Sequence, residues 1–159
     1  AHQGQRLLVD CGLFQGYKQL RLRNWQAMPV TPSDVDAVVL THAHLDHSGY
    51  LPLMYRQGYR GRVHATPATC DLCAILLPDS GHIQEEDAAF LNRHGYTKHS
   101  PAMPLYTKHD ALLSLNLLHP VGTGKPFSPI PGWTVTFQSA GHILGAASIL
   151  VEEIGRAHV

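Results

Sequence analysis

Four side chains that commonly bind metal ions lie within residues 41–47, whose sequence is Thr-His-Ala-His-Leu-Asp-His. In a helix, His42 and His44 would point in different directions, because neighbours on one helical face are three or four residues apart. In an extended segment, residues two apart lie on the same side. We therefore expect an extended loop in which His42 and His44 bind one ion. Asp46 and His47 would then turn toward a second position, and the pattern favours two ions about 3.5–4 Å apart over one crowded ion.

A further histidine, His142, lies in a second segment that could supply a ligand. It is flanked by glycines, which allow a close approach of the backbone, and it follows a predicted strand. On its own, this residue would more often be an ordinary core or loop histidine. Beside the first cluster it becomes the natural third imidazole for the ion held by His42 and His44. A three-histidine site leaves one position open for water, which is the pattern of catalytic zinc.

The elements that must position these residues are predicted from apolar patterns. Strands are predicted at residues 7–9, 36–40, 62–65, 133–139 and 146–152. Helices are predicted at residues 16–24, 48–57, 66–78, 80–93 and 107–118, with the third one ending at Pro78. Strands separated by helices indicate an α/β layered fold. Functional sites gather at strand ends in such sheets, which favours a metal site over a merely solvated histidine-rich loop.

The composition of the chain limits the classes of protein to which it can belong. The 159 residues have the size of one domain, and 12 Lys plus Arg balance 12 Asp plus Glu. This balance of charge gives no support for nucleic-acid binding, although it does not exclude a local basic groove. Apolar stretches are too short for a membrane span, and three cysteines favour a reducing compartment, so we expect a cytoplasmic protein. Cys70 and Cys73 have a CxxC spacing inside an apolar predicted helix, where core packing is the better interpretation than a zinc or redox site.

These motifs, taken together, resemble those of the metallo-β-lactamase fold. Residues 8–12 (Leu-Val-Asp-Cys-Gly) resemble its first motif, residues 42–47 its HxHxDH signature, and Gly141-His142 its third motif. Within this superfamily the chain is most similar to the β-CASP RNA-processing nucleases. That closer match is carried by residues 14–16, 79–87 and 141–146, and the resemblance covers nearly the whole chain.

The resemblance implies a four-layer αβ/βα sandwich with a di-metal site at its edge. Residues 1–159 are expected to be the first half of that metallo-β-lactamase-like domain within a longer protein. The bridging Asp, the last His ligand and the β-CASP cap have no counterpart in the sequence. We therefore expect the chain on its own to be inactive.

The resemblance also assigns roles to individual residues. One zinc ion would be held by His42, His44 and His142, and a second by Asp46 and His47. Asp10, at the end of the first strand, would orient a ligand through its carboxylate, the alternative being a simple turn residue. His82 is a possible group on the substrate side of the site.

The activity implied by the resemblance is hydrolysis of single-stranded RNA. Two zinc ions would generate hydroxide from water near neutral pH, and Asp46 would orient that nucleophile as well as bind metal. One alternative is a small-molecule hydrolase of the same fold, such as a thioesterase or lactamase. Another is a non-catalytic scaffold subunit, against which the complete set of residues 42–47 argues. Exonuclease or endonuclease action and the oligomeric state stay open.

Overall fold

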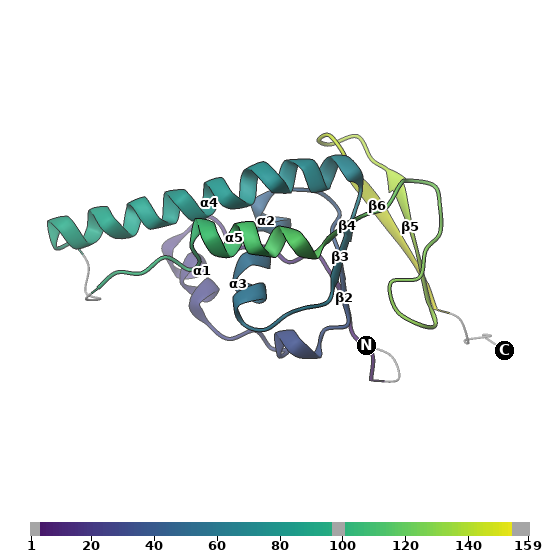
Figure 1. Ribbon diagram of the computed structural model, residues 1–159, viewed down its shortest axis with the longest axis horizontal. Helices are drawn as coiled ribbons and strands as arrows, with labels where there is room; N and C mark the ends of the chain where they lie inside the picture. Colours follow the sequence, from purple (N-terminus) through teal and green to yellow (C-terminus); the bar gives the residue numbers. More distant parts are fainter. Residues whose placement is uncertain (1–3, 97–100, 154–159) are drawn as a thin grey trace.

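The computed structural model describes residues 4–96 and 101–153 (Figure 1). A parallel sheet has the strand order β1-β2-β3-β4, and a separate antiparallel pair consists of β5 and β6. The strands are β1 (Leu7–Val9), β2 (Ala37–Val39), β3 (Arg62–Ala65), β4 (Leu118–Pro120), β5 (Trp133–Ser139) and β6 (Ala147–Glu153). The helices are α1 (Lys18–Leu22), α2 (Leu45–Ser48), α3 (Leu51–Arg56), α4 (Pro67–His94) and α5 (Lys108–Ser114), with 3-10 turns η1 (Arg23–Trp25), η2 (Pro32–Asp34) and η3 (Leu115–Leu117).

The elements form layers on the two faces of the parallel sheet (Figure 1). Helices α3, α4 and α5 cover one face, and the β5–β6 pair lies against the other. Successive residues of a strand point to opposite faces, so Val38 of β2 joins the core under the helices while Val39 joins the core between the sheets. Both residues are fully buried, which explains the continuous apolar run in this strand. The predicted α/β layered fold is confirmed.

Local signals explain the ends of the main helices. The Thr66 hydroxyl accepts a hydrogen bond from the backbone N–H of Thr69 at the start of α4, and Gly95 ends that helix with a φ of 67°. Thr107 and Asp110 form the capping box that the sequence predicts at the start of α5. None of the helices in the described residues is long and apolar enough to cross a membrane.

Two sequence predictions about secondary structure are wrong. Helix α4 runs through Pro78, where the sequence predicts a break between two helices. Proline removes one backbone hydrogen bond, but Leu77 and Ser80 on either side are buried in tertiary contacts that hold the helix together. Strand β4 falls where the sequence predicts a helix end and a loop. It is only three residues long and includes Pro120, so its pairing with β3 leaves almost no local pattern.

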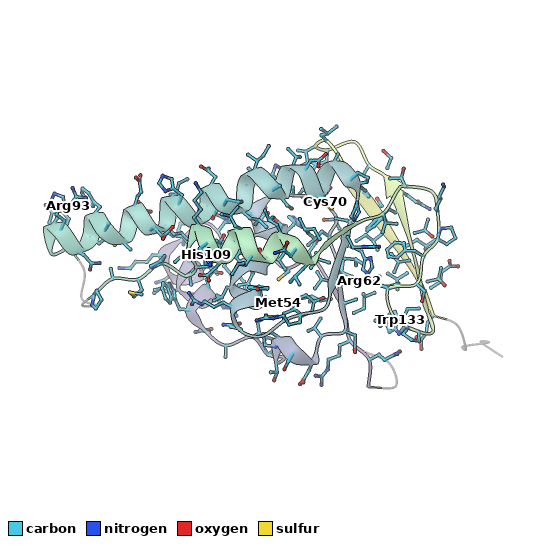
Figure 2. All side chains as sticks on the ribbon, in the orientation of Figure 1. Met54, Arg62, Cys70, Arg93, His109 and Trp133 are labelled. Atoms are coloured by element: carbon cyan, nitrogen blue, oxygen red, sulfur yellow. The ribbon has the colours of Figure 1, made fainter. Side chains whose placement is uncertain are left out.

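The two CxxC cysteines are packing residues, as the sequence predicts. Cys73 is buried in the core under the helices, and Cys70 packs against that core near the start of α4 (Figure 2). Burial raises the pKa of the Cys73 thiol to about 12 and that of Cys70 to about 11. Both are therefore neutral thiols at physiological pH, unsuited to metal binding or redox exchange.

One histidine is buried between the two sheets. His64 on β3 is 4% exposed, and neither ring nitrogen has a hydrogen-bond partner among the described residues. Its ring lies 5.0 Å from that of Phe127 and 5.2 Å from that of His119, measured between centroids. Burial, reinforced by His119 and Arg62, lowers the pKa of His64 to about 4 from 6.5.

We expect the His64→Phe variant to lose part of the acid sensitivity of the wild type. Between pH 6.5 and about 4 the unfolded chain binds a proton at His64 that the folded chain does not, so stability falls as pH falls through this window. Thermal unfolding at about pH 7 and about pH 5 should show a smaller decrease in Tm for His64→Phe than for the wild type. The same decrease in both proteins would contradict the assignment, and His94→Phe at an exposed position is the control.

Candidate metal centre

Three imidazoles from two loops meet beyond the carboxyl end of β2. His42 and His44 follow this strand in a segment without helix or strand, and α2 begins directly after His44, whose φ is −57° and ψ 145°. His142 comes from the loop between β5 and β6. The Nε2 atoms of His42 and His142 lie 3.1 and 3.2 Å from Nδ1 of His44, and the three candidate ligand atoms all lie within 4.8 Å of one another. The structure thus brings together the three imidazoles that the sequence predicts to converge.

The loop that carries His142 is attached at two points. The carbonyl oxygen of Gly145 accepts hydrogen bonds from the hydroxyls of Thr66 and Thr69, at 2.6 and 3.0 Å. The backbone N–H of Ala147 donates to the carbonyl oxygen of Thr41 at 2.9 Å. Gly145 has a φ of +81°, a conformation that favours glycine at this point. The start of α4 and the end of β2 therefore both fix the position of this loop.

Asp10 supports the cluster from the end of β1. Its carboxylate accepts hydrogen bonds from the Thr41 backbone N–H at 2.7 Å, from the Thr41 hydroxyl at 2.9 Å, and from Nδ1 of His47 at 2.7 Å. Asp10 is the one non-glycine residue with a positive φ, 60°, in the part of the chain that the structure describes. Such a conformation is costly for a side chain with a Cβ and persists where surrounding contacts impose it.

These contacts determine which ring nitrogens are free to bind a metal. A carboxylate only accepts hydrogen bonds, so the Thr41 hydroxyl donates to Asp10 and its oxygen accepts from Nδ1 of His42, 2.9 Å away. His42 then carries its proton on Nδ1 and presents an unprotonated Nε2 to the cluster. His47 likewise donates from Nδ1 to Asp10 and keeps Nε2 free. Burial, followed by the neighbouring imidazoles, lowers the pKa of His42, which keeps this ring neutral.

Sequence reasoning missed the part that Thr41 plays in this arrangement. The signal was present, because a hydroxyl residue stands directly before the first histidine of the cluster. Its position shows that one carboxylate, that of Asp10, supports His42 through a hydroxyl and His47 directly.

The other two predicted ligands lie beside the three-histidine cluster. Nε2 of His47 is 3.6 Å from Oδ2 of Asp46, and the His47 ring lies 4.1 Å from that of His42 between centroids. The Asp46 side chain is 56% exposed, so its carboxylate is accessible to solvent. Within residues 4–96 and 101–153, the group of His42, His44 and His142 is the only set of three or more such donors close enough for one ion. The three imidazoles supply enough donors for one metal ion, whereas Asp46 and His47 supply only two donors for a second ion.

A glycine of the first motif fixes the turn that carries Asp46 and His47. The backbone N–H of Cys11 donates to the carbonyl oxygen of His47 at 2.6 Å, and that of Leu13 donates to the carbonyl oxygen of Leu45 at 2.9 Å. A Cβ atom at Gly12 would overlap the carbonyl group of Asp46, which is backbone and has no freedom to rotate away. Only glycine fits between these two segments.

We expect Gly12→Ala to reduce both stability and metal affinity. The added methyl group must push α2 away from the first motif, at a cost of about 1–3 kcal/mol in the free energy of unfolding. Displacing Asp46 and His47 should lower metal affinity at least about tenfold, as loss of ligand support does elsewhere. Thermal unfolding and metal titration measure both effects. Gly122→Ala is the matched control, because nothing lies within 4 Å of a Cβ there, and equal behaviour of the two variants would refute the assignment.

The remaining predicted residues do not join the cluster. His82 lies on an exposed part of α4, 3.7 Å from Glu86 one turn later. Its neighbours Gln84 and Glu85 accept hydrogen bonds from the backbone N–H groups of Leu105 and Lys108, so the segment 79–87 connects α4 to the start of α5. Three other histidines, His94, His109 and His119, are exposed, as their polar sequence surroundings predict, and His99 lies outside the described residues.

Comparison with known proteins shows which proteins the chain is similar to. Residues 1–59 match the profile of the Metallo-beta-lactamase superfamily. Ribonuclease TTHA0252 of Thermus thermophilus is 36% identical over 156 residues, which cover 98% of this chain and 32% of that protein. Transcription termination factor FttA of Methanocaldococcus jannaschii is 32% identical over 142 residues, which cover 89% of this chain and 20% of that protein. The chain thus spans a third or less of the length of these relatives.

Solved structures agree in fold. MEM-A1, a subclass B3 metallo-beta-lactamase from a soil metagenome library, superposes with a TM-score of 0.55 at 19% identity, covering 98% of this chain and 50% of that one. Rm3 metallo-beta-lactamase gives the same TM-score and identity over 99% of this chain and 50% of its own. At this level of identity the likeness concerns the fold alone.

Proposed function

Because the chain belongs to the metallo-β-lactamase superfamily, we propose that it is the first part of the catalytic domain of a zinc-dependent β-CASP ribonuclease that hydrolyses single-stranded RNA. The observation that carries this proposal is the convergence of His42, His44 and His142 with Asp46 and His47 beside them. The names of the relatives, a ribonuclease and a transcription termination factor, support RNA as the substrate class. The free thiols of the chain favour the reducing cytoplasm as its compartment.

Zinc is the metal that the donor set favours. Three neutral imidazoles with one position left open are the ligands of many catalytic zinc sites, and no thiolate takes part. When bound, zinc supplies Lewis acidity and makes water acidic enough to lose a proton near neutral pH. His42 and His47 are held as ligands with free Nε2 atoms by Thr41 and Asp10.

We assign to Asp46 the role of orienting the nucleophile, which is the attacking water. Its carboxylate is solvent-accessible and lies 3.6 Å from the free Nε2 of His47, at the border of the histidine cluster. A carboxylate in this place can accept a hydrogen bond from an attacking water and fix the direction of its lone pair. Asp10 is half-buried and hydrogen-bonds to His47 and Thr41, so its role is positioning.

The experiment is a cleavage assay of the full-length gene product on labelled single-stranded RNA. We expect cleavage that a chelator abolishes and that added zinc restores. The His42→Ala/His44→Ala variant should not respond to zinc. Cleavage that survives chelation, or that persists in the double variant, would refute the proposal.

A further inference from the structure

A solvent-exposed surface of basic and aromatic side chains follows the first motif directly. We call it the 14–25 surface, and it consists of Phe14, Tyr17, Lys18, Arg21, Arg23 and Trp25. Tyr17 is 82% exposed, Trp25 56% and Phe14 46%. Helix α1 within it buries no residue at all. This helix therefore adds no side chain to the core, and its side chains are accessible to a partner.

The charge of this surface is one-sided, although the net charge of the chain is zero. Residues 11–33 contain three Lys or Arg and no Asp or Glu, whereas the whole chain has 12 of each class. No carboxylate of the described residues forms an ion pair with Lys18, Arg21 or Arg23. These cations are therefore available to an anionic partner. A net charge of zero does not exclude a local basic groove, and this surface is such a basic region.

Phe14, one of the three aromatic residues of the surface, is held by its neighbours. Asn24 is buried, and its side chain accepts from the Phe14 backbone N–H at 2.8 Å and donates to the Phe14 carbonyl oxygen at 3.0 Å. The Arg23 guanidinium lies over the Phe14 ring, 4.9 Å from its centroid. This cation–π pair is preformed, which reduces the entropy lost when a further planar group binds.

The surface is continuous with the metal centre. Leu13 donates a backbone hydrogen bond to Leu45, which directly precedes Asp46. Phe14 borders two hollows in the molecular surface. One, of about 430 Å³, lies between Phe14, Trp25 and Leu45, with Asp87 of α4 also at its border. The other, of about 360 Å³, extends from Phe14 to Asp10.

We propose that the 14–25 surface binds single-stranded RNA and leads it to the metal centre, an inference that rests on the proposed ribonuclease function. Bases stack on Tyr17, Trp25 and the Phe14 ring, and Lys18 and Arg21 neutralise phosphates. Aromatic platforms beside cations are the usual means of holding single strands without sequence preference. A protein segment without acidic residues would cover the aromatic rings but leave three cations without countercharge, whereas a single-stranded polyanion with planar bases satisfies both features.

The test measures RNA binding apart from cleavage. The full-length gene product is titrated with a fluorescent oligouridylate in the presence of chelator, over a series of salt concentrations. Tyr17→Ala/Trp25→Ala should raise Kd at least about tenfold, because stacking on aromatic side chains dominates such binding. Lys18→Gln/Arg21→Gln should reduce the slope of log affinity against log salt by about 1.4, or about 0.7 for each phosphate that is no longer neutralised.

The matched control is Tyr55→Ala/Arg60→Gln. These two residues form another arginine–aromatic stack, 4.2 Å from guanidinium to ring centroid, and they precede β3, at the opposite end of the parallel strands from the metal centre. This variant should leave Kd and salt slope unchanged.

The outcomes separate this inference from the proposed function. Unchanged Kd and salt slope in both surface variants would overturn the inference, even if the protein cleaves RNA. A change in oligomeric state or Tm without a change in Kd would assign the surface to a protein interface and also overturn it. If both variants bind RNA more weakly but the wild-type protein fails to cleave RNA, the result would support RNA binding by the 14–25 surface and refute the proposed nuclease activity.

Discussion

The His42→Ala/His44→Ala variant should lose more than about 100-fold in zinc affinity. It removes two of the three nitrogens that converge within 4.8 Å, and changes to the supports of ligands alone already cost about 10–100-fold. Competition with a chromophoric chelator, followed by metal analysis after dialysis, measures the loss. The remaining Nε2 of His142 and the Asp46–His47 pair offer too few donors to one ion to retain it.

The control for this result removes two exposed histidines that lie elsewhere. His94 ends α4, and His109 lies on α5 (Figure 2). His94→Ala/His109→Ala should bind zinc as the wild type does. Equal zinc in the wild type and the His42→Ala/His44→Ala variant would show that the cluster is not the metal site.

The Asp46→Asn variant of the full-length gene product should lose at least about 100-fold in kcat for RNA cleavage. The substitution keeps the size of the side chain but replaces the charged carboxylate, a strong hydrogen-bond acceptor for water, with a neutral amide. Single-turnover cleavage with saturating enzyme measures this step apart from product release. RNA binding should be unchanged, because Asp46 carries no part of the basic surface.

Asp34→Asn is the matched control for Asp46→Asn. The two aspartates are equally accessible, at 55% and 56%, but Asp34 pairs with Arg6 and touches no residue of the cluster. It should cleave RNA at the wild-type rate. A fully active Asp46→Asn variant would remove this residue from the mechanism.

The sequence predicted most of what positions the site. Strands β1, β3 and β5 begin and end where apolar runs or alternation indicate, because each covers a core with a regular pattern. The absence of helix between His42 and His44 agrees with the loop that their spacing of two predicts. That these residues, with His142, bind metal stays a prediction, as do the roles of Asp46, His47 and Asp10.

The features that sequence reasoning missed depend on contacts distant in the chain. Pro78 is a helix breaker by its chemistry, and its place inside α4 depends on packing on both sides of it. Strand β4 exists through its pairing with β3. Thr41 gains its role from the carboxylate of Asp10, 31 residues earlier, which no local pattern reveals.

Anomalous scattering of zinc in a crystal of the zinc-loaded protein would locate the ion directly. We expect an ion about 2.0–2.1 Å from Nε2 of His42, Nδ1 of His44 and Nε2 of His142. We expect no ion at Cys70 and Cys73, whose thiols are packed in and against the core. Zinc bound at the cysteines, or bound to the protein with none at the three imidazoles, would contradict this expectation.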